Sequence, residues 1–223
     1  MSNVVSFEEE NSNVNCGHDA SLNLTANLTI CALLKNTRHS NYHIILGKCT
    51  DLTTPNISFL LYTQIYTGEI RFLISDGASS NIDITGYNLQ LKRWNHVVAV
   101  LSAGFMKVYV NGFKVAADFV RTLNPQALPN MNVLVGGING FGYSTPGQFA
   151  HASVYNRDLS DDEVRYNYEH PGNPKRRGLA LNLTQESIYG AQWVDLSGNG
   201  NHGTYSGGAN LAYPMRANLV TQR

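Results

Sequence analysis

Residues 94–114 read WNHVVAVLSAGFMKVYVNGFK, and this stretch decides the fold class. Residues 94–101 are rich in valine, and apolar residues alternate with more polar ones from 106 to 110, so both segments are predicted to be β-strands. The Asn-Gly pair at 111–112 is typical of a two-residue hairpin turn, because both of its positions need a positive φ. A further strand at 113–116 follows the turn. Three strands in succession indicate a β-rich protein.

The same kind of segment recurs along most of the chain. The 25 Asn and 20 Gly residues supply the turns that many short strands need. The other strand-like segments are residues 28–34, 42–48, 57–66, 69–75, 132–136, 148–156, 178–184, 192–196 and 202–205. One helix is predicted near residues 160–169, because Ser160 and Glu163 form a capping box and Pro171 follows. The predicted fold class is all-β: a jelly-roll β-sandwich with this single short helix.

Composition limits the function classes. The 16 Lys and Arg residues balance the 16 Asp and Glu residues, so the formal net charge is zero, and only 14% of residues are charged. A nucleic acid partner is not expected, because binding to phosphates needs an excess of basic residues. Membrane insertion is not expected, since no apolar run approaches the ~18 residues of a spanning helix. Residues 1–3 do not open a basic and apolar leader, so no signal peptide is expected.

Four stretches of the chain carry a family resemblance. They are residues 6–30, with SFE, SLNLT and LTI, then 94–112, then 147–164, which ends in YNRDLSDDEV, and the turn DLSGNGNHG at 195–203. Together they resemble laminin-G-like domains of the concanavalin A-like lectin/glucanase superfamily, which implies a concanavalin A-like jelly-roll sandwich. The chain is accordingly interpreted as one domain, residues 1–223. It would consist of a core at 1–170, a connector at 171–177 and a C-terminal completing segment at 178–223.

The order of these stretches departs from the family. In such domains the DLSGNGN turn normally precedes the strand that residues 6–8 resemble, whereas here it follows the helix. Residues 178–205 are therefore interpreted as the family's first strands moved to the C-terminus. Two arrangements stay open: the segment completes its own sandwich, or it packs into a neighbouring copy. Leu179, Leu181 and Leu183 alternate, and we expect all three on one buried face.

Glycoside hydrolysis is the least expected function. Retaining glucanases of the superfamily carry Glu-x-Asp-x-x-Glu on one strand, which places two carboxyl groups ~5–5.5 Å apart, and this string is absent. In the run Glu8-Glu9-Glu10, the middle side chain of a strand points away from its two neighbours, so a solvated strand end is expected. The protein is therefore expected not to be an enzyme and to have no catalytic residues.

The best polar candidate is the turn DLSGNGNHG quoted above. Asp195, Asn199 and Asn201 bring side-chain oxygens, which are the ligands that Ca²⁺ prefers. A single carboxylate implies weak affinity, and the alternative is that these side chains bond the backbone of their own loop. Asp195 is the candidate metal ligand, and Asp19 and Asp76 are further carboxylates that could join such a site, although no sequence pattern assigns them to it. No other cofactor is expected.

The best candidate for glycan contacts is the loop 136–143, GGINGFGY, which carries Phe141 and Tyr143. Aromatic rings bind sugars by stacking on the faces of the sugar rings, and packing in the core or at its rim is the alternative for each residue. Further aromatic candidates are Tyr62, Tyr66 and Tyr87. Trp94 and Trp193 are both expected in the core.

The spacing of the cysteine and histidine residues predicts no metal site. Cys31 lies in an apolar run and is expected to be buried, while a Cys16–Cys49 disulfide stays open as an alternative. His39 and His43 are four residues apart in a predicted loop, where metal binding is not expected.

Two main functions from different classes stay open. The first is a non-catalytic structural or decoration component of a surface assembly, with a phage capsid or tail as its setting and other protein subunits, including copies of this chain, as partners. Zero net charge, the low charged fraction and the unusual strand order favour it. The second is a glycan-binding lectin or adhesin, favoured by the resemblance and the aromatic loop. Both place the protein on a virion or an extracellular surface.

Overall fold

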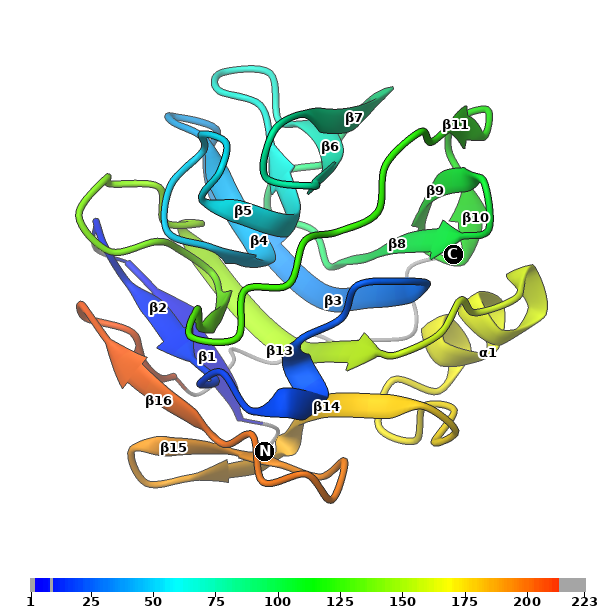
Figure 1. Cartoon of the computed structure of the whole chain (residues 1–223). Coiled ribbons are helices and arrows are strands. Elements are labelled where there is room, and N and C mark those ends of the chain that lie inside the picture. Colours follow the sequence, from blue (N-terminus) through cyan, green and yellow to red (C-terminus); the bar gives the residue numbers. More distant parts are fainter. Residues whose placement is uncertain (1–2, 9, 213–223) are drawn as a thin grey trace.

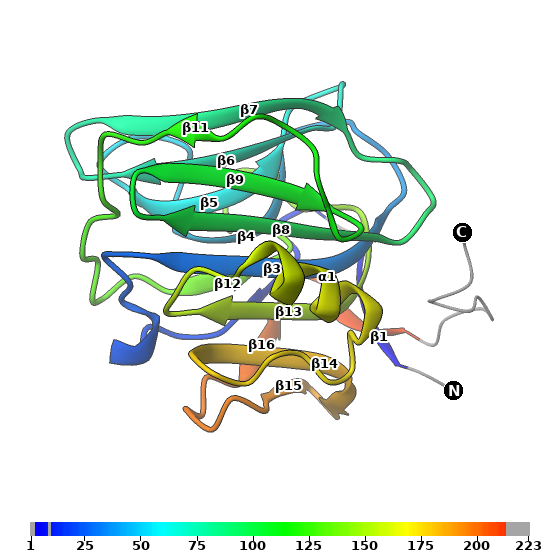
Figure 2. The same cartoon turned by 90° about the vertical axis from the view of Figure 1, so that its right-hand side faces the viewer.

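The computed structural model describes residues 3–8 and 10–212, and its strands lie in two layers (Figures 1 and 2). The strands are β1 (Val4–Phe7), β2 (Asn13–Asn15), β3 (Leu28–Asn36), β4 (His43–Cys49), β5 (Ile57–Thr63), β6 (Glu69–Ser75), β7 (Ser80–Asn88), β8 (Asn95–Ser102), β9 (Phe105–Val110), β10 (Phe113–Lys114), β11 (Phe119–Val120), β12 (Val133–Val135), β13 (Gly147–Tyr155), β14 (Leu179–Tyr189), β15 (Gln192–Asp195), β16 (Gly203–Ser206) and β17 (Asn210–Ala212). A 3-10 turn, η1, spans Ala20–Leu22, and one α-helix, α1, spans Asp161–Glu169. The all-β prediction with one short helix near residues 160–169 is confirmed.

Antiparallel pairing places the strands in two sheets. The first sheet has the order β7-β6-β5-β4-β12-β2-β16-β15. The second has the order β9-β8-β3-β13, and β13 then pairs with both β1 and β14 along different halves of its length. Strand β17 lies beside β1, and β14 also pairs with β15, so it joins the two sheets.

The core lies between the two sheets. Phe59 and Phe72 enter it from the first sheet, and Val97 and Phe149 enter it from the second, all with no exposed surface. Burial of large apolar side chains from both layers is the main force that holds a sandwich together. This arrangement is a β-sandwich with one continuous core.

The two tryptophans differ in their placement. Trp193 is fully buried in the core, as predicted, and its indole N–H donates to the Thr184 carbonyl oxygen at 2.7 Å. The prediction for Trp94 is wrong, because this side chain is half-buried on the outer face of the second sheet against Leu33 and Ala150. Val97 and Ala99 point into the core, so alternation places Trp94 with Val98 on the outer face.

The C-terminal segment pairs with strands of its own chain. Its strand β14 lies against β13, β16 lies against β2, and β17 lies against β1. Leu181 and Leu183 are buried in the core, but the expectation that Leu179 shares their face is wrong. Strand β13 pairs Val154 with Leu181 and then Tyr155 with Leu179, so Ala180 is an extra residue in a β-bulge. The bulge turns Leu179 toward the helix side of the sheet.

Helix α1 begins with the predicted capping box. The Ser160 hydroxyl accepts from the Glu163 N–H at 3.3 Å, and the Glu163 carboxylate accepts from the Ser160 N–H at 3.1 Å. Val164 then packs on Val98 and Tyr155 of the second sheet, so the helix covers part of that outer face (Figure 2). Among the described residues there is no helix of the length and apolarity that crossing a membrane requires.

The predicted hairpin at Asn111-Gly112 is confirmed. Both residues have a positive φ, 51° and 83°, and Phe113 pairs directly with Val110 across the turn. The Asn111 side-chain oxygen accepts from the His96 N–H at 2.9 Å, which joins the turn to β8. A Cβ at position 112 would lie 3.0 Å from the ring of Tyr168, so helix α1 also favours glycine there.

Candidate functional site

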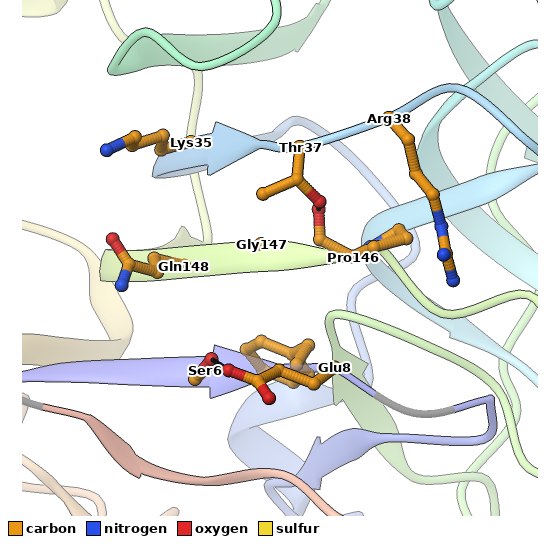
Figure 3. Close-up of a pocket in the computed structure, with 9 residues that line it drawn as sticks. Ser6, Glu8, Lys35, Thr37, Arg38, Pro146, Gly147 and Gln148 are labelled. Atoms are coloured by element: carbon orange, nitrogen blue, oxygen red, sulfur yellow. Dashed lines mark hydrogen bonds between the residues drawn. The ribbon is translucent and has the colours of Figure 1, made fainter.

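Two adjoining cavities open where β1 and β3 end and β13 begins, and we call them together the edge groove. Their volumes are ≈ 330 and ≈ 120 Å³. Figure 3 shows the larger one. Its lining residues are Ser6, Phe7, Glu8, Lys35, Thr37, Arg38, Pro146, Gly147 and Gln148. The smaller cavity is lined by Glu10, Arg38, Ser40, Asn41, Gly142, Ser144 and Pro146. Arg38 and Pro146 border both.

Strand register brings the polar side chains of the larger cavity together. Gln148 on β13 lies opposite Lys35 on β3 and opposite Ser6 on β1. Their neighbours Phe149 and Val5 point into the core, so alternation turns these three residues outward. Gly147 lets the strands meet here, because a Cβ at that position would lie 2.1 Å from the Lys35 carbonyl oxygen.

The charged side chains of the edge groove lie on two sides. Lys35 and Arg38 come from β3 and the segment after it, and Glu8 comes from the end of β1 (Figure 3). Glu10, two residues beyond Glu8, lines the smaller cavity. Within the described part of the chain, none of these four residues takes part in an ion pair. The groove therefore offers donors on one side and carboxylate acceptors on the other to a bound molecule.

An aromatic row borders the smaller cavity. Phe141 and Tyr143 are stacked, with ring centroids 5.6 Å apart and planes at 16°. Tyr42 meets Tyr143 edge-on at 5.7 Å and continues to Tyr62 at 6.3 Å. Phe141 is 48% exposed. Gly142, between the two stacked residues, is part of the cavity wall, whereas neither ring lines a cavity, so the row lies beside the groove.

The structure thus brings together three of the aromatic residues that the sequence singled out. Tyr66 and Tyr87 are not members of the row: Tyr66 is 77% exposed in the β5–β6 turn, and Tyr87 packs against the core. Tyr42 was not predicted, because nothing in its local sequence distinguishes it from a strand residue. Its place in the row depends on contacts with a loop about a hundred residues later.

His43 directly follows Tyr42 of this row and is the first residue of β4. Its side chain is buried, and burial, with the charges of His39 and Arg38, lowers its pKa to about 4. The ring is therefore neutral near pH 7. Its Nε2 accepts from the Asn41 N–H at 3.4 Å, which supports the loop that carries Tyr42.

The Asp195 carboxylate holds its own turn. One oxygen accepts from the N–H groups of Asn182 and Ser197, at 2.8 and 2.9 Å, and the other accepts from the Ser197 hydroxyl and the Asn201 N–H, at 2.7 and 3.0 Å. All four donors belong to the turn or to the adjacent strand β14. This geometry fits the alternative in which the polar residues bond their own backbone.

The other polar candidates are also engaged locally. Asn199 and Asn201 both donate to the Ala180 carbonyl oxygen, at 3.2 and 2.8 Å. Asn201 and Asp19 line a separate open cavity of ≈ 550 Å³, whereas Asp76 accepts from the N–H groups of its own β6–β7 turn. Within residues 3–8 and 10–212, no three His, Cys, Asp or Glu side chains are grouped to hold a metal ion.

The remaining sequence candidates have these placements. Cys31 is buried as predicted, and Cys16 and Cys49 are buried free thiols rather than a disulfide. Glu8 and Glu10 are exposed, and Glu9 lies outside the described residues. Residues 213–223 of the C-terminal segment also lie outside them.

Comparison with known proteins places the fold. The closely similar solved structures include a candidate carbohydrate-binding protein from Bacteroides ovatus, with 17% identity and a TM-score of 0.68 over 95% of this chain and 60% of that one. They also include a native heptameric SAP-like pentraxin from Limulus polyphemus, with 16% identity and a TM-score of 0.62 over 99% and 97%. A third is domain 4 of an extracellular GH43 arabinanase from Geobacillus stearothermophilus, in complex with arabinotriose, with 16% identity and a TM-score of 0.54 over 66% and 68%.

These identities show a shared fold and no more, and the chain spans less than two thirds of the Bacteroides protein. No curated protein sequence matches the chain. The sequence model of Laminin_G_3, described as the concanavalin A-like lectin/glucanases superfamily, matches residues 8–165 and stops before the C-terminal segment. That match covers well over half of the chain and agrees with the lectin-like β-sandwich described above. The chain therefore belongs to the Laminin_G_3 family of the concanavalin A-like lectin/glucanases superfamily.

Proposed function

We propose that the protein binds an oligosaccharide, without cleaving it, at the edge groove and the aromatic row. The observation that carries this proposal is Phe141, 48% exposed and stacked on Tyr143, beside a groove lined by charged side chains that form no ion pair within the described residues. An aromatic face packs against the apolar C–H face of a sugar ring. The groove's cations, amides and carboxylates then donate to and accept from the sugar's hydroxyl groups.

Size and chemistry of the groove support this proposal. The larger cavity, ≈ 330 Å³, lies within the ~300–1,000 Å³ range of small-molecule sites. Small-molecule sites usually combine an apolar surface with a few polar groups. The arabinanase domain that shares this fold was solved with arabinotriose, and the Bacteroides protein is described as a candidate carbohydrate-binding protein.

The groove's carboxylates favour binding over hydrolysis. A glycosidase needs one carboxyl group whose surroundings keep it protonated near neutral pH, beside a second that stays ionised. Glu8 and Glu10 are both exposed, and the Glu8 carboxylate accepts from the Ser6 hydroxyl at 3.1 Å. Neither has the apolar pocket that such a general acid requires.

A glycan array followed by calorimetry tests the proposal. We expect the wild-type protein to bind at least one oligosaccharide and to return it intact. Phe141→Ala should weaken binding about tenfold, which corresponds to about 1.4 kcal/mol of lost stacking. Tyr189→Ala is the matched control, because Tyr189 is also an exposed aromatic residue, at 65%, and is the last residue of β14, away from the groove. No hit on the array, or equal binding by Phe141→Ala, would contradict the proposal.

A second candidate function is a structural role in a surface assembly, such as a virion. It is favoured by exposed apolar side chains on neighbouring strands at the β9 edge. Phe105, 41% exposed, lies opposite Val120, 63% exposed, and Phe113 on β10 is 62% exposed. Apolar side chains gathered on a surface in this way are typical of protein contacts.

Light scattering across a concentration series tests this second candidate. We expect the wild-type protein to self-associate and the double variant Phe113→Asp, Val120→Asp to stay monomeric with an unchanged far-UV spectrum. The charges would make burial of this edge in a contact unfavourable. A wild-type protein that stays monomeric at every concentration speaks against self-assembly through this edge.

A further inference from the structure

The loop that carries Phe141 is held by a residue far away in the sequence. Phe141 lies between Gly140 and Gly142, which have φ values of 85° and 66°. The N–H groups of both glycines donate to one atom, the side-chain oxygen of Asn11, at 2.9 and 3.1 Å. Asn11 lies between β1 and β2, about 130 residues earlier, so these bonds fix the loop to the body of the sandwich.

The opposite side of the same loop is held by a second amide. Asn41, after β3, donates from Nδ2 to the Gly142 carbonyl oxygen at 3.2 Å. Its own Oδ1 accepts from the Tyr42 N–H at 2.8 Å, so the residue that holds Gly142 also orients a member of the aromatic row. Gly142 is thus bonded through both its N–H and its C=O.

Asn11 itself is in a well-supported position. Its φ of 70° is one that asparagine adopts more readily than most side chains. The next residue, Ser12, donates to the Gly207 carbonyl oxygen at 2.6 Å, and its own carbonyl accepts from the Ser144 hydroxyl at 3.0 Å. The turn that presents Asn11 is therefore anchored on both neighbouring loops.

We propose that Asn11 is a positioning residue of the glycan site, which holds the exposed Phe141 ring stacked on Tyr143 beside the groove. This inference rests on the proposed function. A glycine-flanked aromatic residue has many conformations in a free loop, and selecting one of them on binding costs affinity. The two hydrogen bonds to the Asn11 side-chain oxygen select one conformation of the loop before the ligand arrives.

Two substitutions separate the effect of the Asn11 side-chain oxygen from the effect of the positive φ at position 11. Asn11→Gly keeps the positive φ without strain and removes only the side chain. Asn11→Asp keeps an oxygen that accepts from both N–H groups and is also tolerated at positive φ. The probe is the oligosaccharide that the wild-type protein binds most tightly on the array. We expect Asn11→Gly to bind it about tenfold more weakly and Asn11→Asp to bind within about twofold of the wild type.

Two readouts without ligand accompany the binding assay. Hydrogen exchange of the Gly140 and Gly142 amides should accelerate in Asn11→Gly and not in Asn11→Asp. The near-UV circular dichroism band of the stacked Phe141–Tyr143 pair should weaken in the same variant. The melting temperature reports any general loss of structure and should change little.

The binding assay and the ligand-free readouts test glycan binding and the role of Asn11 separately. Equal affinity of Asn11→Gly and wild type, or equal weakening by both variants, would overturn the role of Asn11. If the wild-type protein binds no glycan while the exchange and near-UV changes occur, the proposed function fails and the positioning of Phe141 by Asn11 stands. If neither ligand-free readout changes, the positioning inference is wrong whatever the array shows.

Discussion

A chain cut after Pro174 is expected not to unfold cooperatively, because it lacks β14, β15, β16 and β17. These strands bring core residues that residues 1–174 cannot replace, among them Leu181, Leu183, Ile188 and Trp193. Burial of each such side chain is worth about 1.5–3 kcal/mol, so four of them equal a large share of the 5–15 kcal/mol of a typical domain. The edges of β2 and β13 would also lose the strands that pair with them.

Calorimetry and dye binding measure this effect. The fragment 1–174 should show no cooperative melting peak, and it should bind a hydrophobic dye or precipitate. The complementary control is addition of a peptide spanning 175–223, which should restore a melting transition. A fragment that stays soluble and monomeric, and melts near the temperature of the full chain, would show that residues 178–223 are an appendage to a complete sandwich.

Acidification from pH 7 to pH 4.5 is expected to lower the free energy of unfolding by several kcal/mol. His96 on β8 and His151 on β13 flank Leu33 in one register row of the second sheet, and both are buried. Neither ring nitrogen of His96 has a hydrogen-bond partner within the described residues, and Tyr168 of α1 lies 5.9 Å from its ring. Burial lowers the pKa of His96 to about 3 and that of His151 to about 4.

These pKa values explain why acidification lowers the free energy of unfolding. In the folded protein both rings stay neutral until the pH falls to about 3–4, whereas in the unfolded chain they take up a proton below about 6.5. Their stability contribution is therefore fully present above pH 6.5 and is lost as the pH falls toward the folded pKa. At pH 4.5 the loss is about 2–3 kcal/mol for each fully buried ring.

Urea unfolding at a series of pH values measures the loss. His96→Phe keeps a ring of similar size and removes one titrating group, so its free energy of unfolding should fall less steeply between pH 6.5 and 4.5. His18→Gln is the matched control, since it removes a histidine whose side chain is exposed. Parallel pH profiles for wild type and His96→Phe would mean that the buried ring is not the source of acid sensitivity.

Local patterns predicted the parts of the fold that local physics determines. The Asn111-Gly112 turn and the capping box at Ser160 are short-range signals, and both appear where expected. Alternation failed at Leu179, because a β-bulge is set by the match between two strands rather than by one sequence. Trp94 is a different case, since the alternation of β8 itself assigns it to the outer face with Val98 and Val100, and its size alone was a poor guide to the core.

The candidate site was only partly predictable for a related reason. A glycine-rich loop with two aromatic residues marks Phe141 and Tyr143 from the sequence alone. The groove, the hydrogen bonds to Asn11 and the hydrogen bond from Asn41 join segments about 100 to 130 residues apart. Such contacts leave no periodic or motif signal at either end, so they appear only when the register of β1, β3 and β13 is known.

The pairing of β1 with β17 has a consequence for synthesis on the ribosome. Ser6 lies opposite Asn210 in this pair, so the pair cannot form until some two hundred intervening residues have been made. At roughly 5–20 residues per second, that interval lasts on the order of 10–40 seconds. Both edges of β1 stay open until β13 has been made, and one edge stays open until β17 follows. Chaperones that hold unpaired strand edges are therefore expected to engage this chain through most of its translation.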